Sequence, residues 1–361
     1  MNKWLILCKR EVVEIERLRY KAHKNVRVEA MSTKSIKSAE EHMKQGGNVL
    51  CVNLLSKELM RAEYPEKLYV YLYGHPVQMA EVIKEADERI HFIFPEKKYA
   101  EYAEKYYHVQ SGFFAQDTRL IKEGIEWQRR EVEVLYSGNY LNPEDGKKSM
   151  DENTPDIMHE IIYNSIEKYG NPTTSLDEAF ALAIRESGCT ERDGLIRDLM
   201  ENYMMPIIEY HMRVYRDAMI RELAERALNV AVYGINWEVL RNKLRVDVRN
   251  KVMVVSPFLS AALSPQKLMN TKVLFSTSLP NKESLTEEEL LGMNLGCIVL
   301  KEKTPFSVEL AEETGMVLTY EPSRIKQVCK KVAKMIQSSP SIRKEETGDW
   351  AKQMLEYLEE L

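Results

Sequence analysis

Residues 271–300 read TKVLFSTSLPNKESLTEEELLGMNLGCIVL, and this stretch decides the fold class. An apolar, strand-like run over residues 271–279 comes first, and a segment that suits a helix follows over residues 285–295. A glycine turn then leads into a second strand-like run over residues 296–302. Strand, helix and strand in this order predict a βαβ unit with two parallel strands.

The helix predicted in this stretch begins with three consecutive acids, Glu287, Glu288 and Glu289. The N-terminus of a helix carries partial positive charge and unpaired N–H groups, so acids are stabilising there, and Thr286 or Ser284 can serve as the cap. Two interpretations stay open. The acids are a solvated, capped helix start, or they face a ligand whose hydroxyl groups they hold.

The same alternation of strand and helix signals extends in both directions from this stretch. Helical segments separate the strand-like runs, which favours βαβ units and parallel sheets. The runs cover residues 4–8, 25–32, 48–55, 67–74, 89–95 and 108–114, and then 130–140, 228–238, 251–259, 271–279, 296–302 and 315–322.

One block interrupts the alternation. Residues 141–156 read as a polar loop, and residues 153–228 have helical periodicity without a strand signal. The sequence therefore predicts an α/β protein with two Rossmann-like domains that face a crevice at the carboxyl ends of their strands, and an all-helical insert. We expect an N-terminal domain over 1–125, a C-terminal domain over 126–345 that contains the insert 153–228, and a closing helix over 346–361.

Composition narrows the classes of function. The 361 residues have a net charge of -5 that is spread along the chain, which speaks against nucleic acid as a partner. The five cysteines are far apart and show no metal-ligand spacing, which is typical of reduced thiols in the cytoplasm. The apolar run 4–8 is too short for a signal peptide or a membrane span. We expect a cytoplasmic protein without a bound metal.

Glycines and aromatic residues at strand ends are the candidate ligand-binding features. Gly138 and Gly234 each lie near the end of a strand-like run, where a glycine lets backbone N–H groups approach a pyrophosphate or simply makes a turn. Trp237 can stack on a base or pack at the hinge, and packing is favoured. His75 follows the run 67–74; it is a candidate general base, or a structural histidine in a proline turn.

Three segments in order resemble a known family: VLYSGNY at 134–140, VAVYGINWE at 230–238, and the strand, helix and glycine turn of 271–300. Together they are similar to GT-B glycosyltransferases, and specifically to the bacterial group related to the spore maturation protein CgeB. The resemblance covers residues 65–361. It implies transfer of a sugar from a nucleotide-sugar donor, without a bound metal or other cofactor, to an unknown acceptor such as a protein or a cell-surface glycan.

The resemblance also assigns roles to individual residues. His75 would be the acceptor-side catalytic residue. The residues that would bind the donor lie at the strand ends and in the acidic helix: Ser137, Gly138, Tyr233, Gly234, Asn236, Trp237 and Glu287.

The sequence departs from the family pattern at two places. Glu288 stands where the family usually has an arginine that neutralises the donor phosphate, and residues 112–117 (GFFAQD) stand where relatives carry Pro-His-Gly. These departures favour an alternative hypothesis, a catalytically degenerate scaffold or partner subunit of another glycosyltransferase. A third hypothesis, an α/β enzyme such as an epimerase, is disfavoured because no GxGxxG follows the first strand.

Overall fold

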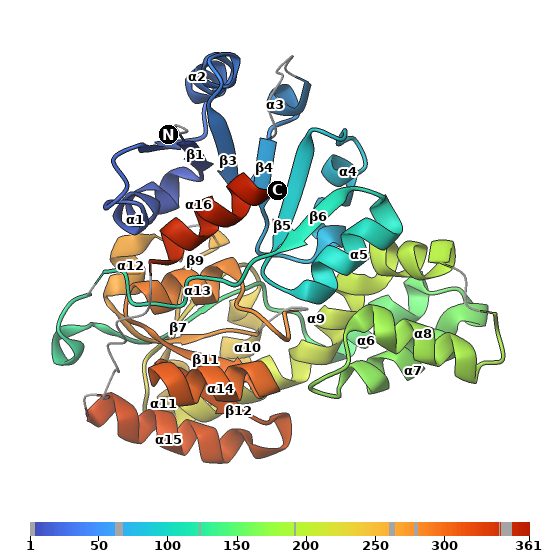
Figure 1. Cartoon of the computed structure of the whole chain (residues 1–361). Coiled ribbons are helices and arrows are strands. Elements are labelled where there is room, and N and C mark those ends of the chain that lie inside the picture. The colour runs from blue at the N-terminus through green and yellow to red at the C-terminus, as the bar shows by residue number, and fades with distance from the viewer. Residues whose placement is uncertain are drawn as a thin grey trace. The chain divides into compact units, whose positions relative to one another are not determined.

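The computed structural model describes residues 4–61, 68–122, 124–190, 193–259, 264–277, 281–338, 340 and 349–361 (Figure 1). Contacts divide the chain into two compact units. The first comprises Met1–Lys122, Ser284–Leu290 and Glu345–Leu361, and the second comprises Glu123–Glu283 and Leu291–Lys344. The expected limit at 345/346 lies outside the described residues. No helix in the described part of the chain is long and apolar enough to cross a membrane.

A sheet of six parallel strands forms the centre of the first unit, in the order β2-β1-β3-β4-β5-β6. Strands β1, β4 and β5 are buried along their whole length, as expected for a parallel sheet with both faces covered. The strands are β1 (Trp4–Cys8), β2 (Val26–Ala30), β3 (Asn48–Val52), β4 (Leu68–Tyr71), β5 (Ile90–Phe94) and β6 (Gln110–Phe113). The helices are α1 (Val13–Arg19), α2 (Thr33–Lys44), α3 (Lys57–Arg61), α4 (Ala80–Ile83), α5 (Lys97–Tyr107) and α16 (Trp350–Glu360), with 3-10 turns at Arg10–Val12 and Pro76–Met79.

The second unit has its own sheet of six parallel strands, in the order β12-β11-β10-β7-β8-β9. Counted within this sheet, the order is 6-5-4-1-2-3, which is the strand order of the dinucleotide-binding Rossmann fold. The strands are β7 (Val132–Ser137), β8 (Val230–Tyr233), β9 (Val252–Ser256), β10 (Thr271–Phe275), β11 (Ile298–Glu302) and β12 (Val317–Tyr320). Helices follow these strands: α10 (Trp237–Lys243), α11 (Val246–Arg249), α12 (Pro265–Met269), α13 (Glu287–Asn294), α14 (Pro305–Thr314) and α15 (Ile325–Gln337). Residues 287–290 of α13 are counted in the first unit.

Each strand-like run of the sequence contains a strand, and the predicted class of two Rossmann-like α/β halves with a helical insert is confirmed. The prediction of the strands succeeded because buried strands of a parallel sheet usually appear in the sequence as short, continuous apolar runs. Residues 278–279 of the run 271–279 lie outside the described residues.

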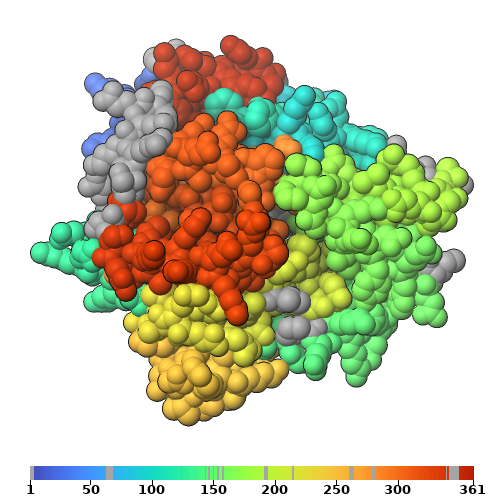
Figure 2. All heavy atoms as spheres, turned by 90° about the horizontal axis from the view of Figure 1, so that it is seen from below, coloured from blue at the N-terminus to red at the C-terminus, as the bar shows by residue number. Residues whose placement is uncertain are grey.

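Helices make up the block between β7 and β8: α6 (Pro143–Asn153), α7 (Asp156–Tyr169), α8 (Leu176–Glu186) and α9 (Asp193–Glu225). No strand occurs among the described residues of 153–228, as predicted. Figure 2 shows the green part of this block on one side of the second unit, with later segments of the unit in yellow to red-orange beside it.

The expected loop over 141–156 was wrong, because α6 occupies most of it. Pro143 stands at the first turn of α6, where a proline is tolerated, and the buried Met150 anchors the helix, which packs on α9. The sequence is too polar over this stretch for its periodicity to reveal a helix.

Arg130, which precedes β7, hydrogen-bonds to three separate backbone segments of the second unit. It is 7% exposed, and its guanidinium donates to the backbone oxygens of Ile125 (2.8 Å), Thr271 (2.7 Å) and Gly296 (2.6 Å). Burial lowers the pKa of Arg130, and the carbonyl oxygens replace the water that the charge has lost.

We therefore expect Arg130→Ala to lower the free energy of unfolding by about 3 kcal/mol or more, because buried carbonyl groups lose a charged donor. Urea unfolding measures the loss. Arg129→Ala is the matched control, since the neighbouring Arg129 side chain is 79% exposed and pairs only at the surface with Glu126. Equal stability losses in the two variants would contradict this role of Arg130.

Candidate functional site

The carboxyl ends of β7 and β10 are the first place to seek a ligand in the second unit. Strand β7 begins this sheet; β8 and β9 lie on one side of it, and β10, β11 and β12 lie on the other. The connections from the two sides diverge between β7 and β10, and open α/β sheets bind ligands outside the carboxyl ends of the strands at such a switch point.

The structure brings together the turns predicted to bind the donor. The N–H of Gly138, after β7, donates to the oxygen of Tyr233 at 3.0 Å, and the N–H of Tyr140 donates to the oxygen of Ile235 at 2.9 Å. The Asn139 side chain accepts a hydrogen bond from the N–H of Ile235 at 3.1 Å. Ser137 and Gly138 therefore lie directly beside Tyr233 and the turn that follows it.

Gly234 is required by the close approach of these two turns. Its φ is +123°, a conformation that side chains rarely adopt, and a Cβ atom there would lie 2.3 Å from the backbone oxygen of Gly138. Any other residue would push the two turns apart. Gly234 thus shapes the edge of the sheet, whether or not its N–H also contacts a ligand.

Trp237 packs beneath the turn at Gly138. It is fully buried, donates from Nε1 to the backbone oxygen of Gly138 at 2.8 Å, and packs against the rings of Tyr136 and Tyr140. Asn236 precedes it with φ of +68° at the start of α10. The packing interpretation of Trp237 fits these contacts, because the indole has no face open to a base.

A buried arginine that the sequence did not single out lies at the switch point. Arg216 of α9 is 1% exposed; its guanidinium interacts with the Tyr136 hydroxyl, and Nη1 donates to Glu209 Oε2 at 3.2 Å. The Tyr136 hydroxyl also lies 3.2 Å from Thr277 Oγ1, just after β10. Among the described residues, Nε and Nη2 of Arg216 have no hydrogen-bond partner.

The electrostatics of this group keep both partners in the protonated form. Burial raises the pKa of Tyr136, so its phenol remains a donor at neutral pH. Burial opposes the charge of Arg216, but Tyr136 and Glu209 outweigh it and hold the pKa of the guanidinium above its ordinary value. The switch point of the second sheet thus has a permanent positive charge with two nitrogens to offer.

In the first unit, the corresponding place lies between β1 and β3, and Glu287 occupies it. The Glu287 carboxylate accepts hydrogen bonds from Lys9 Nζ at 2.5 Å, just after β1, and from Asn53 Nδ2 at 2.6 Å, just after β3. Asn53 has φ of +52° and accepts from the N–H of Tyr73 at 3.2 Å. Glu287, predicted to hold a donor ribose, is thus bonded to these two residues of the first unit.

The other acids of the triplet have different environments. Glu289 forms a capping box with Thr286: its carboxylate accepts from the Thr286 N–H at 2.8 Å, and its own N–H donates to Thr286 Oγ1 at 3.2 Å. Thr286 is therefore the cap. Ser284, the other candidate, donates to Glu96 at 2.7 Å instead.

Glu288 is the acid of the triplet whose buried carboxyl oxygen, Oε1, has no hydrogen-bond partner within the described residues. Burial, together with the neighbouring Glu289 and Glu287, raises the pKa of Glu288 to about 8. Glu288 is therefore mostly protonated at neutral pH, and it adds little negative charge where the resemblance implied an arginine.

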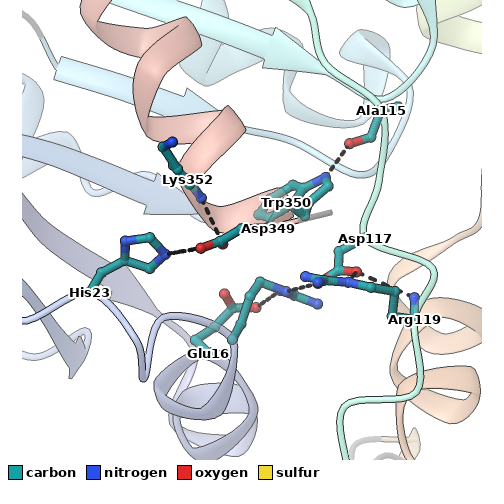
Figure 3. Close-up of polar contacts among 9 residues, drawn as sticks. Glu16, His23, Ala115, Asp117, Arg119, Asp349, Trp350 and Lys352 are labelled. Carbon is teal, nitrogen blue, oxygen red and sulfur yellow. Dashed lines mark hydrogen bonds and ion pairs between the residues drawn. The ribbon is translucent and has the colours of Figure 1, made fainter. Parts of the chain in front are cut away.

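A second polar cluster of the first unit holds α16 in place (Figure 3). Arg19 pairs with Glu16 and, at 3.1 Å, with Asp117, and both carboxylates are buried. Arg119 donates to Asp117 at 2.6 Å as well. The guanidinium of Arg19 also lies 5.3 Å from the centre of the Trp350 ring, at the start of α16. The sequence missed this cluster because its members are far apart in the chain.

Further contacts in Figure 3 fix the first turn of α16. Trp350 Nε1 donates to the backbone oxygen of Ala115 at 2.7 Å. Asp349 caps the helix through the N–H of Lys352 at 3.0 Å, and His23 contacts the same carboxylate at 3.0 Å. These contacts account for the assignment of α16 to the first unit.

His75 does not have the environment of a general base. It is 4% exposed and its ring lies between those of Tyr99 and Tyr102, 4.8 and 4.7 Å from their centres. Nδ1 accepts the N–H of Val77 at 3.2 Å, which caps the 3-10 turn Pro76–Met79. Burial lowers the pKa of His75 to about 3, so the ring is a weak base. The structural interpretation of His75 fits these observations.

Comparisons with known proteins do not identify a family for this chain. Neither a family model nor a curated protein sequence matches the chain. Among solved structures, it is similar to a UDP-forming α,α-trehalose-phosphate synthase from Burkholderia xenovorans, with a TM-score of 0.40 and 8% identity over 94% of this chain and 92% of that one. A similarity of this degree says nothing of the reaction.

Within the described residues, no group of three or more His, Cys, Asp or Glu side chains could hold a metal ion.

The lowered pKa of His75 predicts a loss of stability in acid. A folded-state pKa of about 3, below the ordinary value of 6.5, means that stability is complete above about pH 6.5 and falls as the pH drops towards 3. His75→Asn keeps an oxygen that can cap the turn but does not titrate, so we expect a flatter acid limb in thermal unfolding between pH 6.5 and about 3. His108→Asn, at an exposed histidine, is the control and should leave that limb unchanged.

The raised pKa of Glu288 predicts the opposite slope. Because the folded state keeps a proton that the unfolded state releases, stability falls as the pH rises from about 4.5 to about 8. We expect Glu288→Gln to increase the free energy of unfolding by at least about 1 kcal/mol at pH 8 and to have little effect at pH 4. Urea unfolding at both pH values tests this, with the exposed Glu313→Gln as control. A gain of the same size at pH 4 would contradict the titration of Glu288 as its cause.

Proposed function

We propose that the protein is a GT-B-type glycosyltransferase that binds a nucleotide-sugar donor at the carboxyl edge of its second sheet. The strand order of that sheet is the observation that carries this proposal, because it is the order that places a nucleotide at the switch point between β7 and β10. The turn at Gly138 and Gly234, where backbone lies against backbone, supports a site shaped by main chain.

The reaction is a substitution at the anomeric carbon of the donor sugar. The bond from that carbon to the diphosphate oxygen breaks, and a bond to an acceptor hydroxyl oxygen forms. The hydroxyl proton passes to the departing nucleoside diphosphate, since His75 is buried and too weak a base to take it. Stabilisation of the leaving diphosphate by fixed positive charge and hydrogen-bond donors is then the main contribution of the protein.

A second candidate function is the catalytically degenerate scaffold or partner subunit. The bonding of Glu287 to Lys9 and Asn53 favours it, because the chain itself occupies the switch point of the first sheet. The burial of His75 favours it as well. The fold alone does not choose between the two functions.

The proposed function predicts both binding and turnover. Thermal unfolding with UDP-, GDP- and ADP-glucose should show one donor that stabilises the protein, by roughly 2.7 kcal/mol at about 100 times its Kd. Release of the matching nucleoside diphosphate in the presence of oligosaccharide or protein acceptors measures transfer. Stabilisation without release with any acceptor would support the scaffold, and absence of both would reject donor binding.

A further inference from the structure

We propose that Arg216, carried by the helical insert, binds the diphosphate group of the donor at the switch point of the second sheet. This inference rests on the proposed function and names the residue that provides the positive charge. It identifies an anion site made by Arg216, the Tyr136 hydroxyl and Thr277, beside the turn at Gly138.

The geometry places these groups at one point. Tyr136 is the penultimate residue of β7, and its hydroxyl lies 3.2 Å from Thr277 Oγ1 after β10. A Cβ atom on Gly138 would lie 2.5 Å from that hydroxyl, so the Tyr136 side chain reaches over the turn that follows β7. Arg216 interacts with the same hydroxyl. The two strands of the switch point and the guanidinium therefore converge on the Tyr136 oxygen.

The unused donors of Arg216 distinguish a ligand site from a structural tie. An arginine that only joined α9 to the sheet would bury its N–H groups against acceptors, because each unpaired buried donor costs free energy. Arg216 is 1% exposed, and yet Nε and Nη2 have no hydrogen-bond partner among the described residues. Nε and one Nη are the pair that a guanidinium offers to two oxygens of a phosphate in the bidentate arrangement.

The charge balance also suits an anion. The carboxylate bonded to Arg216 belongs to Glu209, whose side chain is 37% exposed and thus partly screened by water, while the guanidinium side chain is 1% exposed. Attraction between a buried charge and an anion is stronger than in water because the local dielectric is low. Arg216 can thereby do what an arginine at the position of Glu288 does in the family that the sequence resembles.

Calorimetry with inorganic pyrophosphate and with UDP, GDP and ADP tests the site. We expect Arg216→Gln to weaken pyrophosphate and nucleoside diphosphate binding by about tenfold or more, the scale of a lost charge-assisted hydrogen bond. The control is Arg213→Gln, which removes another buried arginine of α9 that lies over the Tyr210 ring, and it should leave the affinity unchanged.

Glu209→Gln provides a test in the opposite direction that does not depend on the folding of the Arg216 variant. Loss of the carboxylate bonded to Arg216 should tighten pyrophosphate binding several-fold, whereas an arginine with a structural role alone would only alter the unfolding temperature. Thermal unfolding of each variant separates the two effects.

The outcomes separate this inference from the proposed function. Binding that is equal in wild type and in folded Arg216→Gln overturns the inference and leaves the function standing. Pyrophosphate binding that depends on Arg216, in a protein that neither binds nor cleaves any nucleotide sugar, supports the anion site and overturns the function. If wild type binds neither pyrophosphate nor any nucleoside diphosphate, both are wrong.

Discussion

The order of strands in a parallel sheet is the constraint on which the candidate sites depend. Parallel pairing brings the carboxyl ends of all strands to one edge, and the order decides between which two strands the connections diverge. In the second sheet that pair is β7 and β10, and in the first it is β1 and β3. Because of this order Tyr136 meets Thr277 although they are distant in the chain, and Lys9 and Asn53 both reach the carboxylate of Glu287.

The two edges differ in how completely their charges are compensated. In the first unit, Glu287 pairs with Lys9, and Arg19 pairs with Glu16 and Asp117, whereas Glu288 has an unpartnered oxygen but is mostly protonated at neutral pH. In the second unit, Arg216 is buried with two nitrogens unused among the described residues. Buried polar groups nearly always have hydrogen-bond partners, so two unpartnered nitrogens on one fully buried guanidinium need an explanation, and the proposed anionic ligand provides one. This contrast favours the second edge as the place where an anionic ligand binds.

The sequence predicted the strands well because most of them are short apolar runs between turn residues, so the class of fold followed from a local signal. It also located the glycine turns of the second sheet, where the approach of Gly234 to the Gly138 oxygen leaves no room for a side chain. It could not find Arg216, Arg19 or Asp117, whose roles depend on which elements pack together. It misjudged α6 because this helix is polar and rests on the buried Met150.

The resemblance implied a phosphate-binding arginine at position 288, and we propose that Arg216 of the insert helix α9 provides that positive charge instead. An arginine at position 288 would have been supplied by a helix that follows a strand, but that place has a glutamic acid whose raised pKa keeps it mostly uncharged at neutral pH. Glu287 is bonded to Lys9 and Asn53, and Glu289 forms a capping box with Thr286, so both of these acids have partners within the first unit. The proposed anion site does not depend on position 288, and Arg216 suits it because a guanidinium keeps its proton even when it is buried.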